Sequence, residues 1–234
     1  EYSIILIGLL ILTDLWSAGK RYLDSERFER PSVIQKSFTP SIADEMILQD
    51  TSYFRVLNLS VSTFNDNSPT SYFHKSIGGY HGAKLKRYQE LIDTSITVNI
   101  ESFITRAKTA NSVNDLVTVF NNSNAINMLN AKYVIYNPEV PPLKNNKALG
   151  NAWFAEKVKF AANANEELSS INYFNPSSEA VVDVRYREHI DKSDYPSEAA
   201  DTIFLVSYKP NELAYRYSSA GERLAVFSEI YYPA

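Results

Sequence analysis

The sequence predicts an α+β fold: a helical first half, then a mainly antiparallel β-sheet or partial sandwich, with an apolar helix at the N-terminus. Three observations support this prediction. An uncharged apolar run occupies residues 2–12, helical periodicity dominates residues 83–129, and β-rich segments separated by turn residues dominate residues 179–231. Because helices and strands are segregated in this way, α+β is favoured over a repeated βαβ arrangement.

The composition is that of a globular protein. The chain has 234 residues, 44% of them hydrophobic and 21% charged, which excludes a disordered or collagen-like chain. Its net charge of -4 supplies no basic field, so we expect no nucleic-acid partner. The sequence has no Cys, which excludes disulfide scaffolds, Cys-based zinc sites and thiol catalysis.

The apolar run from Tyr2 to Leu12 suggests a membrane segment. As a helix it would cover about 17 Å, against a hydrocarbon core of about 30 Å. We therefore expect a fragment in which residues 1–16 are the trailing part of a longer transmembrane helix and residues 1–23 include the membrane exit. Trp16 suits the interface, Lys20 and Arg21 suit the polar side, and membrane lipid is the expected partner. The alternative is an apolar helix buried in a soluble core.

Asp14 is an acidic residue just beyond the end of the apolar run. A carboxylate inside a membrane helix is costly and by default indicates a function. Here we expect it near the interface, where it marks the end of the apolar helix.

Helices and two strands are expected up to residue 136. Ser41 precedes a short helix as its N-cap, and Pro69 precedes one helical turn within the long polar loop 64–82. The predicted helices are 42–48, 83–93, 96–110, 113–120 and 124–129, and the predicted strands are 53–59 and 131–136.

The second half is predicted to consist mainly of strands. After the Pro- and Asn-rich connection 137–151, a strand is expected over 152–160 and a helix over 165–173. Further strands are expected at 180–185, 202–209, 212–218 and 223–231, with turn residues between the last three that indicate an antiparallel meander. We expect three segments: 1–23, an α+β subdomain over 24–150, and a truncated β-rich subdomain over 151–234.

Common catalytic motifs are absent from the sequence. It has no GxGxxG, Walker A, HExxH, GxSxG or D-x-D pattern, and no carboxylate pair or nucleophile constellation that would support a stand-alone hydrolase. His74 and His81 would need a third metal ligand, for which Asp66 is the obvious residue, and a zinc site is disfavoured. We predict no catalytic residue, no metal and no resident cofactor.

The stretch 64–93 holds the densest cluster of unusual residues. A glycine-bearing loop runs into a helix N-terminus beside several cations, which suits a phosphate or diphosphate, while tyrosines could stack on sugars and Asn or Asp could bind hydroxyls. The predicted glycan- or phosphate-binding residues are Asn65, Asp66, Tyr72, His74, Lys75, Tyr80, His81, Lys84 and Arg87. The alternative is a structured loop in which Gly78-Gly79 supplies positive φ, the aromatic side chains pin the loop to the core, and the cations form a solvated helix face.

Several segments resemble a known family. Residues 54–57, 64–66 and 70–93, with Met128–Ile135, Ala148–Phe154 and Val226–Pro233, are similar to the extracytoplasmic region of bacterial YfhO-type multi-pass membrane proteins. The resemblance covers nearly the whole chain, and residues 70–93 are its most specific part. It implies a large integral membrane protein grouped with polyprenyl-phosphate-sugar-dependent (GT-C-like) glycosyltransferases of the cell envelope.

This resemblance implies that the domain lies on the extracytoplasmic (periplasmic) side of the cell membrane. In GT-C enzymes the catalytic acid lies on an early loop that this chain lacks, so the resemblance transfers no catalytic residue and implies a fragment inactive alone. One hypothesis is a domain that engages the acceptor or a lipid-linked sugar donor of a membrane glycosyltransferase. The alternative is a non-catalytic glycan-binding or assembly module of the envelope.

Overall fold

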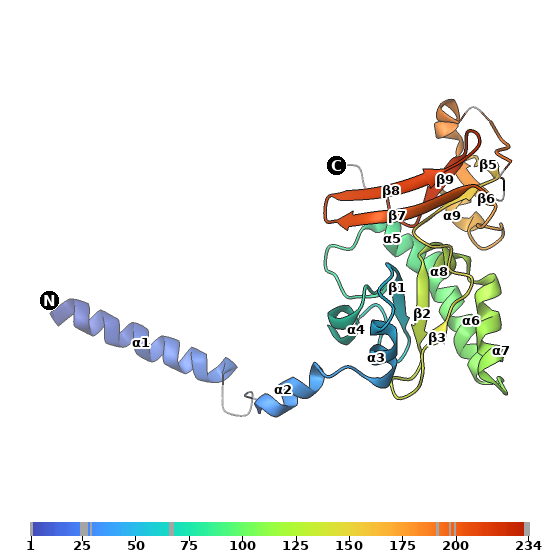
Figure 1. The fold of residues 1–234 in the computed structure, drawn as a ribbon. Coiled ribbons are helices and arrows are strands. Elements are labelled where there is room, and N and C mark those ends of the chain that lie inside the picture. The colour runs from blue at the N-terminus through green and yellow to red at the C-terminus, as the bar shows by residue number, and fades with distance from the viewer. Residues whose placement is uncertain are drawn as a thin grey trace. The chain divides into compact units, whose positions relative to one another are not determined.

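The computed structural model describes residues 2–23, 28, 30–65, 68–190, 192–196, 198 and 200–231. The chain divides into two compact units, Glu1–Thr39 and Pro40–Ala234. The second unit continues across position 150 (Figure 1), and the three segments expected from the sequence stay a prediction.

The first unit contains helices α1 (Tyr2–Tyr22) and α2 (Pro31–Ser37). Helix α1 has 21 residues, none of them buried, and is long and apolar enough to cross a membrane. Its length corresponds to about 32 Å, which matches a hydrocarbon core of about 30 Å.

Helix α1 continues beyond the apolar run 2–12. It is therefore longer than the run alone predicted. The hydroxyl groups of Thr13 and Ser17 donate to backbone carbonyls one turn back, at Leu10 and Asp14, so these polar side chains are accommodated within the helix. Asp14 therefore lies within α1 and does not mark its end, contrary to the expectation. Lys20 and Arg21 occupy the last turn, where cations interact favourably with the helix dipole.

A three-stranded sheet organises the second unit. Its order is β1 (Arg55–Asn58), β2 (Ala131–Ile135) and β3 (Leu143–Lys144), with β1 and β2 parallel and β2 and β3 antiparallel. The loop that follows α4 (Ser68–Phe73) adds to the edge of β1. There the Val56 amide donates to Lys75 at 2.8 Å, and the Ile77 amide donates to Val56 at 3.1 Å.

Helices surround this sheet and bury its side chains. Ser41 caps α3 (Ile42–Leu48) and Ser112 caps α7 (Val113–Val117), each through a reciprocal capping box with an Asp. The predicted helix over 83–93 begins later, as α5 (Lys86–Leu91), and passes through the π-helical turn Ile92–Ile96 into α6 (Thr97–Ala107), while α8 (Asn124–Met128) leads into β2. Figure 1 shows α6 and α7 beside β2 and β3. The main core includes Leu57, Ile96, Phe120, Ile126 and Val134.

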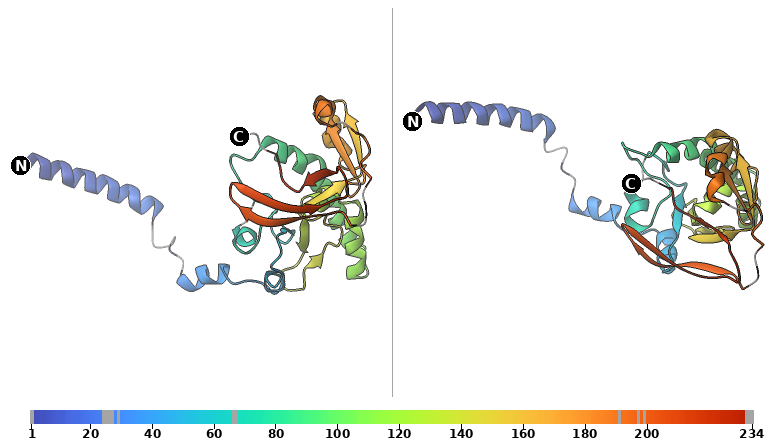
Figure 2. Two further views of the ribbon diagram at one scale, coloured as in Figure 1. Left: turned by 45° about the horizontal axis from the view of Figure 1, so that its top comes forward. Right: turned by 90° about the horizontal axis from the view of Figure 1, so that it is seen from above.

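Within the described residues, six further strands form three two-stranded sheets. β4 (Ala152–Ala155) pairs antiparallel with β9 (Leu224–Phe227), and β7 (Thr202–Lys209) pairs antiparallel with β8 (Glu212–Ser218). β5 (Lys157–Ala161) pairs parallel with β6 (Glu179–Asp183), and α9 (Ala164–Ser170) connects them (Figure 2).

The α+β prediction is confirmed: helices dominate the first half and strands the second, with mostly antiparallel sheets and the apolar N-terminal helix. Two details differ. The predicted strand 152–160 is two strands in different sheets, because the Glu156 and Lys157 amides both turn to the Ser178 carbonyl. The predicted meander reduces to the β7–β8 hairpin, because β9 pairs with β4 instead of β8.

Candidate functional site

Within the stretch 64–93, the backbone is held firmly at Gly78 and Gly79. A Cβ on Gly78 would lie 2.0 Å from the Thr63 carbonyl oxygen, so only glycine fits there. Gly79 has a φ of 131°, and its amide donates to the same carbonyl at 2.8 Å. The Tyr88 hydroxyl donates to the Ile77 carbonyl, and burial raises the pKa of Tyr88 to about 12. These contacts are the ones expected of a structured loop.

Two of the predicted binding residues are used within the fold. The Nε2 atom of His74 lies 2.8 Å from Asp44 Oδ1, and the His74 side chain is only 3% exposed. The ammonium of Lys75 lies 4.5 Å from the ring centroid of Tyr53, which stacks on Tyr208 at 4.3 Å. Both contacts join separate elements, which gives His74 and Lys75 structural roles in this unit.

The other predicted residues are dispersed along the loop surface. Asn65 and Tyr72 are exposed, and Tyr80 is 69% exposed. His81 Nδ1 accepts a hydrogen bond from the Ala83 amide, and the Lys84 ammonium lies over the Phe64 ring at 5.5 Å. Asp66 lies outside the described residues. The loop therefore displays aromatic and polar groups without gathering them into one site.

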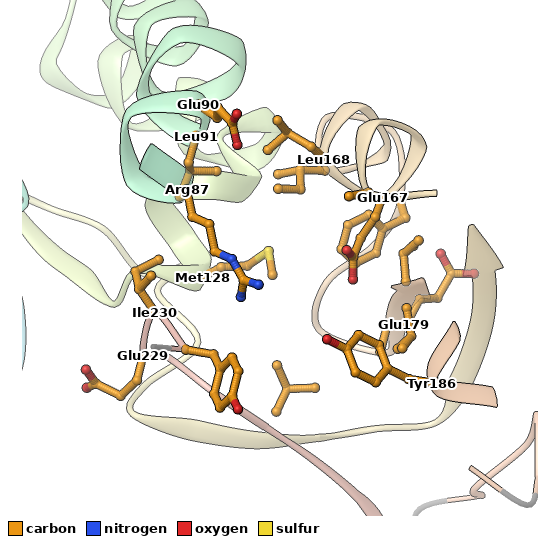
Figure 3. Close-up of a pocket in the computed structure, with 18 of the residues that line it drawn as sticks. Arg87, Glu90, Leu91, Met128, Glu167, Leu168, Glu179, Tyr186, Glu229 and Ile230 are labelled. Atoms are coloured by element: carbon orange, nitrogen blue, oxygen red, sulfur yellow. The ribbon is translucent and has the colours of Figure 1, made fainter. Parts of the chain in front are cut away.

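Arg87 is the exception, because it lines a cavity of about 710 Å³. The cavity lies between α5, α9, β6, the 3-10 helix Val184–His189, and the segment that follows β9. Figure 3 shows the Arg87 side chain extending into it from α5. A cavity of this size is typical of a small-molecule site.

The walls are mainly apolar and aromatic. The side chains come from α5, α8, β4, α9, β6 and β9, and the indole N–H of Trp153 is already satisfied by the Pro176 carbonyl at 2.7 Å. Apolar and aromatic lining residues include Leu91, Met128, Trp153, Leu168, Ile171, Phe174, Val182, Tyr186, Ile230 and Tyr231. Such walls favour a ligand that has an apolar or flat-faced body.

Most charged groups around the cavity are paired. Arg185 lies 3.2 Å from Asp183, and Glu179 lies 2.8 Å from Lys159. Glu229 lies 2.8 Å from Arg55, and its carboxylate turns away from the cavity centre in Figure 3. Glu90 forms a looser pair with Lys86 at 3.6 Å on the surface of α5.

Arg87 differs from these groups. Among the described residues, no carboxylate lies within 4 Å of its guanidinium, whose carbon atom lies 5.8 Å from the Tyr231 ring centroid. A guanidinium presents a planar set of donors that fits phosphate or carboxylate oxygens in a bidentate manner. Within the described part of the chain, Arg87 thus has no anionic partner, and its guanidinium suits an anionic group of a ligand.

Glu167 faces Arg87 from α9. Its carboxylate and the Tyr186 hydroxyl both point into the cavity in Figure 3. Burial raises the pKa of Glu167, and the charge of Asp183 adds to the rise, whereas the Asp183 amide, at 3.3 Å, and the Arg185 and Arg87 charges oppose it. A half-buried carboxyl with a perturbed pKa in a cavity is typical of a functional site.

The sequence indicated one residue of this site, Arg87, and missed Glu167, Trp153 and Tyr186. These three lie on elements 66 or more positions further along the chain, and none stands in a recognisable motif. The raised pKa of Glu167 can be inferred only once its burial is known, since the sequence does not distinguish it from Glu166, the other acid of α9.

Across the part of the chain that is described, no group of three or more His, Asp or Glu side chains is placed to hold a metal ion. No family model, no curated protein and no solved structure matches the chain. The geometry of the site consists of an apolar and aromatic cavity, the Arg87 guanidinium, which has no carboxylate partner among the described residues, and the opposing Glu167 carboxyl.

Proposed function

We propose that this chain is the membrane-anchored, extracytoplasmic domain of a cell-envelope protein that binds a lipid-linked sugar phosphate in the Arg87 cavity. The observation that carries the proposal is the Arg87 guanidinium, which has no carboxylate partner in the described part of the chain and which extends into a cavity with apolar and aromatic walls. The guanidinium suits the phosphate, the aromatic faces suit a sugar ring, and the apolar wall suits the first units of a lipid chain.

Helix α1 supports the anchored arrangement. Its apolar side chains are exposed along the whole helix, which is favourable in lipid and unfavourable in water. An anchor of this kind would hold the domain near membrane-borne ligands, which raises their effective concentration. The resemblance to YfhO-type proteins supports the same placement and a role in glycosyltransferase chemistry of the envelope.

Glycosyl transfer itself is proposed for a larger protein that includes this chain. The described residues supply binding groups for a donor or an acceptor, and we assign no catalytic residue to them. Lipid-linked sugar is a substrate in this proposal and the protein needs no resident cofactor for binding.

Binding can be measured with the intrinsic fluorescence of Trp153. The chain has two Trp residues, so Trp16→Phe leaves the cavity indole as the only reporter. The full chain in lipid nanodiscs would be titrated with glucosyl farnesyl phosphate, a phosphodiester. We expect saturable binding that weakens at least tenfold in Arg87→Ala, because the charged hydrogen bonds to phosphate are lost.

Two further variants sharpen this test. Arg216→Ala removes an exposed cation of the hairpin that is remote from the cavity lining, and it should bind like the parent. Lys75→Ala tests whether the stretch 64–93 also contacts the ligand, because Lys75 lies outside the cavity lining. Equal binding by Arg87→Ala and the parent would refute the cavity proposal. Binding of free glycan without any dependence on the lipid phosphate would support the non-catalytic glycan-binding module instead.

A further inference from the structure

We propose that Glu167 is the specificity-determining residue of the cavity: as a neutral acid it donates a hydrogen bond to the anionic group bound by Arg87. The cavity would then take up one monoanionic ligand together with one proton. This inference rests on the proposed function, because it needs an anion at Arg87.

The geometry places the two groups on facing walls. Arg87 projects from α5 and Glu167 from α9, and both side chains enter the same cavity (Figure 3). Glu167 uses Oε1 for a long hydrogen bond of 3.3 Å from the Asp183 amide. Among the described residues, its Oε2 atom has no hydrogen-bond or ion-pair partner, so one oxygen is available to a ligand.

Most charged residues of the cavity lining are paired, and only Arg87 and Glu167 among those described are not. Arg185, Glu179, Glu229 and Glu90 each have a partner of opposite sign within 4 Å. Arg87 and Glu167 remain, with opposite charges that do not touch. If Glu167 stayed ionised, an anion bound at Arg87 would face a like charge across the cavity. A neutral Glu167 removes this repulsion and leaves a single positive charge, which matches a monoanion.

The groups around Glu167 favour the neutral form when an anion binds. Asp183 on β6 is buried and negative, and the ligand would add a second negative charge. The opposing cations are Arg185, which Asp183 already partners, and Arg87, which the ligand would neutralise. Tyr186 faces Glu167 with a neutral hydroxyl, and Glu90, Glu179 and Glu229 also line the cavity. Burial already raises the pKa of Glu167 in the free protein.

The sign of the linkage follows from these charges. Anion binding raises the pKa of Glu167 above its value in the free protein, so binding takes up a proton. Affinity is therefore highest at low pH, falls as the pH rises from the pKa of the free state to the higher pKa of the bound state, and levels off above it. The fall is at most about tenfold per pH unit for one proton.

The test uses the same full chain in nanodiscs with Trp16→Phe, and glucosyl farnesyl phosphate between pH 5 and pH 8. The phosphodiester keeps one negative charge over this range, so the ligand does not titrate. We expect the dissociation constant to rise more than tenfold across the range in the parent. Glu167→Gln keeps a neutral donor in place, and its dissociation constant should stay low and vary less than twofold.

Glu188→Gln serves as the matched control, because this exposed carboxyl lies outside the cavity lining and its variant should keep the pH dependence of the parent. Farnesyl phosphate, a dianion at pH 8, should bind more weakly there than the diester. Arg87-dependent binding that is equally tight at pH 5 and pH 8 would refute the role of Glu167 and leave the proposed function standing. A Glu167→Gln variant that retains the full pH dependence would do the same. Loss of binding at every pH in the parent would overturn the proposed function itself.

Discussion

Arg55 of β1 and Glu229, which follows β9, form an ion pair of 2.8 Å although they lie 174 positions apart. The same guanidinium donates to the Leu129 carbonyl at 3.0 Å and to the Ser228 carbonyl at 2.6 Å. One side chain therefore joins the first strand of the three-stranded sheet to the last segment of the chain. That segment, in turn, forms one wall of the Arg87 cavity.

Replacing Arg55 with Met should destabilise the second unit by about 2–3 kcal/mol, because several hydrogen bonds are lost and the Leu129 and Ser228 carbonyls lose their donor. The free energy of unfolding would be measured by urea denaturation. Arg216→Met, on the exposed face of β8, is the control and should change stability by less than about 0.5 kcal/mol. A variant of Arg55 as stable as the parent would show that the pair contributes nothing to folding.

Gly78→Ala should destabilise the loop 64–93 by about 1–3 kcal/mol or more, since the added Cβ would overlap the Thr63 carbonyl oxygen. Gly82→Ala is a matched control in the same loop, where an added Cβ meets nothing within 4 Å. Thermal denaturation of both variants would compare the two positions. Equal melting temperatures for the two variants would contradict the close approach at Gly78.

The Asp44–His74 pair predicts a pH dependence of stability. Burial raises the pKa of Asp44, but hydrogen bonds to His74 and Ser41 outweigh it and hold the pKa below the usual 3.8. The stabilisation is therefore present above the unfolded-state pKa and is lost as the pH falls through the lower folded-state pKa. The parent should lose more stability than Asp44→Asn when the pH is lowered from about 5 to about 2, as urea denaturation would measure. Parallel losses in the two proteins would argue against this pair.

The orientation of α1 can be tested with a single thiol, because the protein has no Cys of its own. Ser219→Cys places a thiol in the turn after β8, on the second unit. A membrane-impermeant maleimide should label it in intact bacterial cells if the domain is extracytoplasmic. Labelling only after the cells are lysed would place the domain inside the cell and overturn the proposed location.

Anchoring by α1 should depend on its apolar side chains. Leu10→Arg puts a charge in the helix, at a cost of about 2.5–3.5 kcal/mol near a bilayer centre. We expect this variant to be extracted from membranes by alkaline carbonate, whereas Leu10→Ile should stay in the pellet. Equal retention of both variants would show that α1 is not what holds the protein to the membrane.

The sequence predicted best those features that local residues determine. The Ser41-to-Asp44 spacing encodes a reciprocal cap, and α3 begins and ends where that cap and its apolar residues predict. The β7–β8 hairpin likewise has the predicted bounds, because the Lys209-Pro-Asn211 turn separates two alternating segments. In both cases the signal and the structure span fewer than about twenty residues.

Long-range pairing could not be predicted in this way. The strand 224–227 is apolar at all four positions, a pattern that suits pairing with either β8 or β4, and only the tertiary fold selects β4. The cavity has the same origin, since Arg87, Glu167 and Tyr231 become neighbours through folding. Among the described residues Arg87 has no carboxylate partner. This follows from the tertiary arrangement and could not be predicted from the sequence pattern.

The wall contributed by residues 226–231 also has a consequence for biosynthesis. Among the described residues, helix α1 is synthesised before every element that lines the cavity, whereas Ile230 and Tyr231 are among the last to be made. The cavity is therefore complete only after α1 has been synthesised. Nascent chains arrested before position 226 should be targeted to membranes yet be unable to capture ligand.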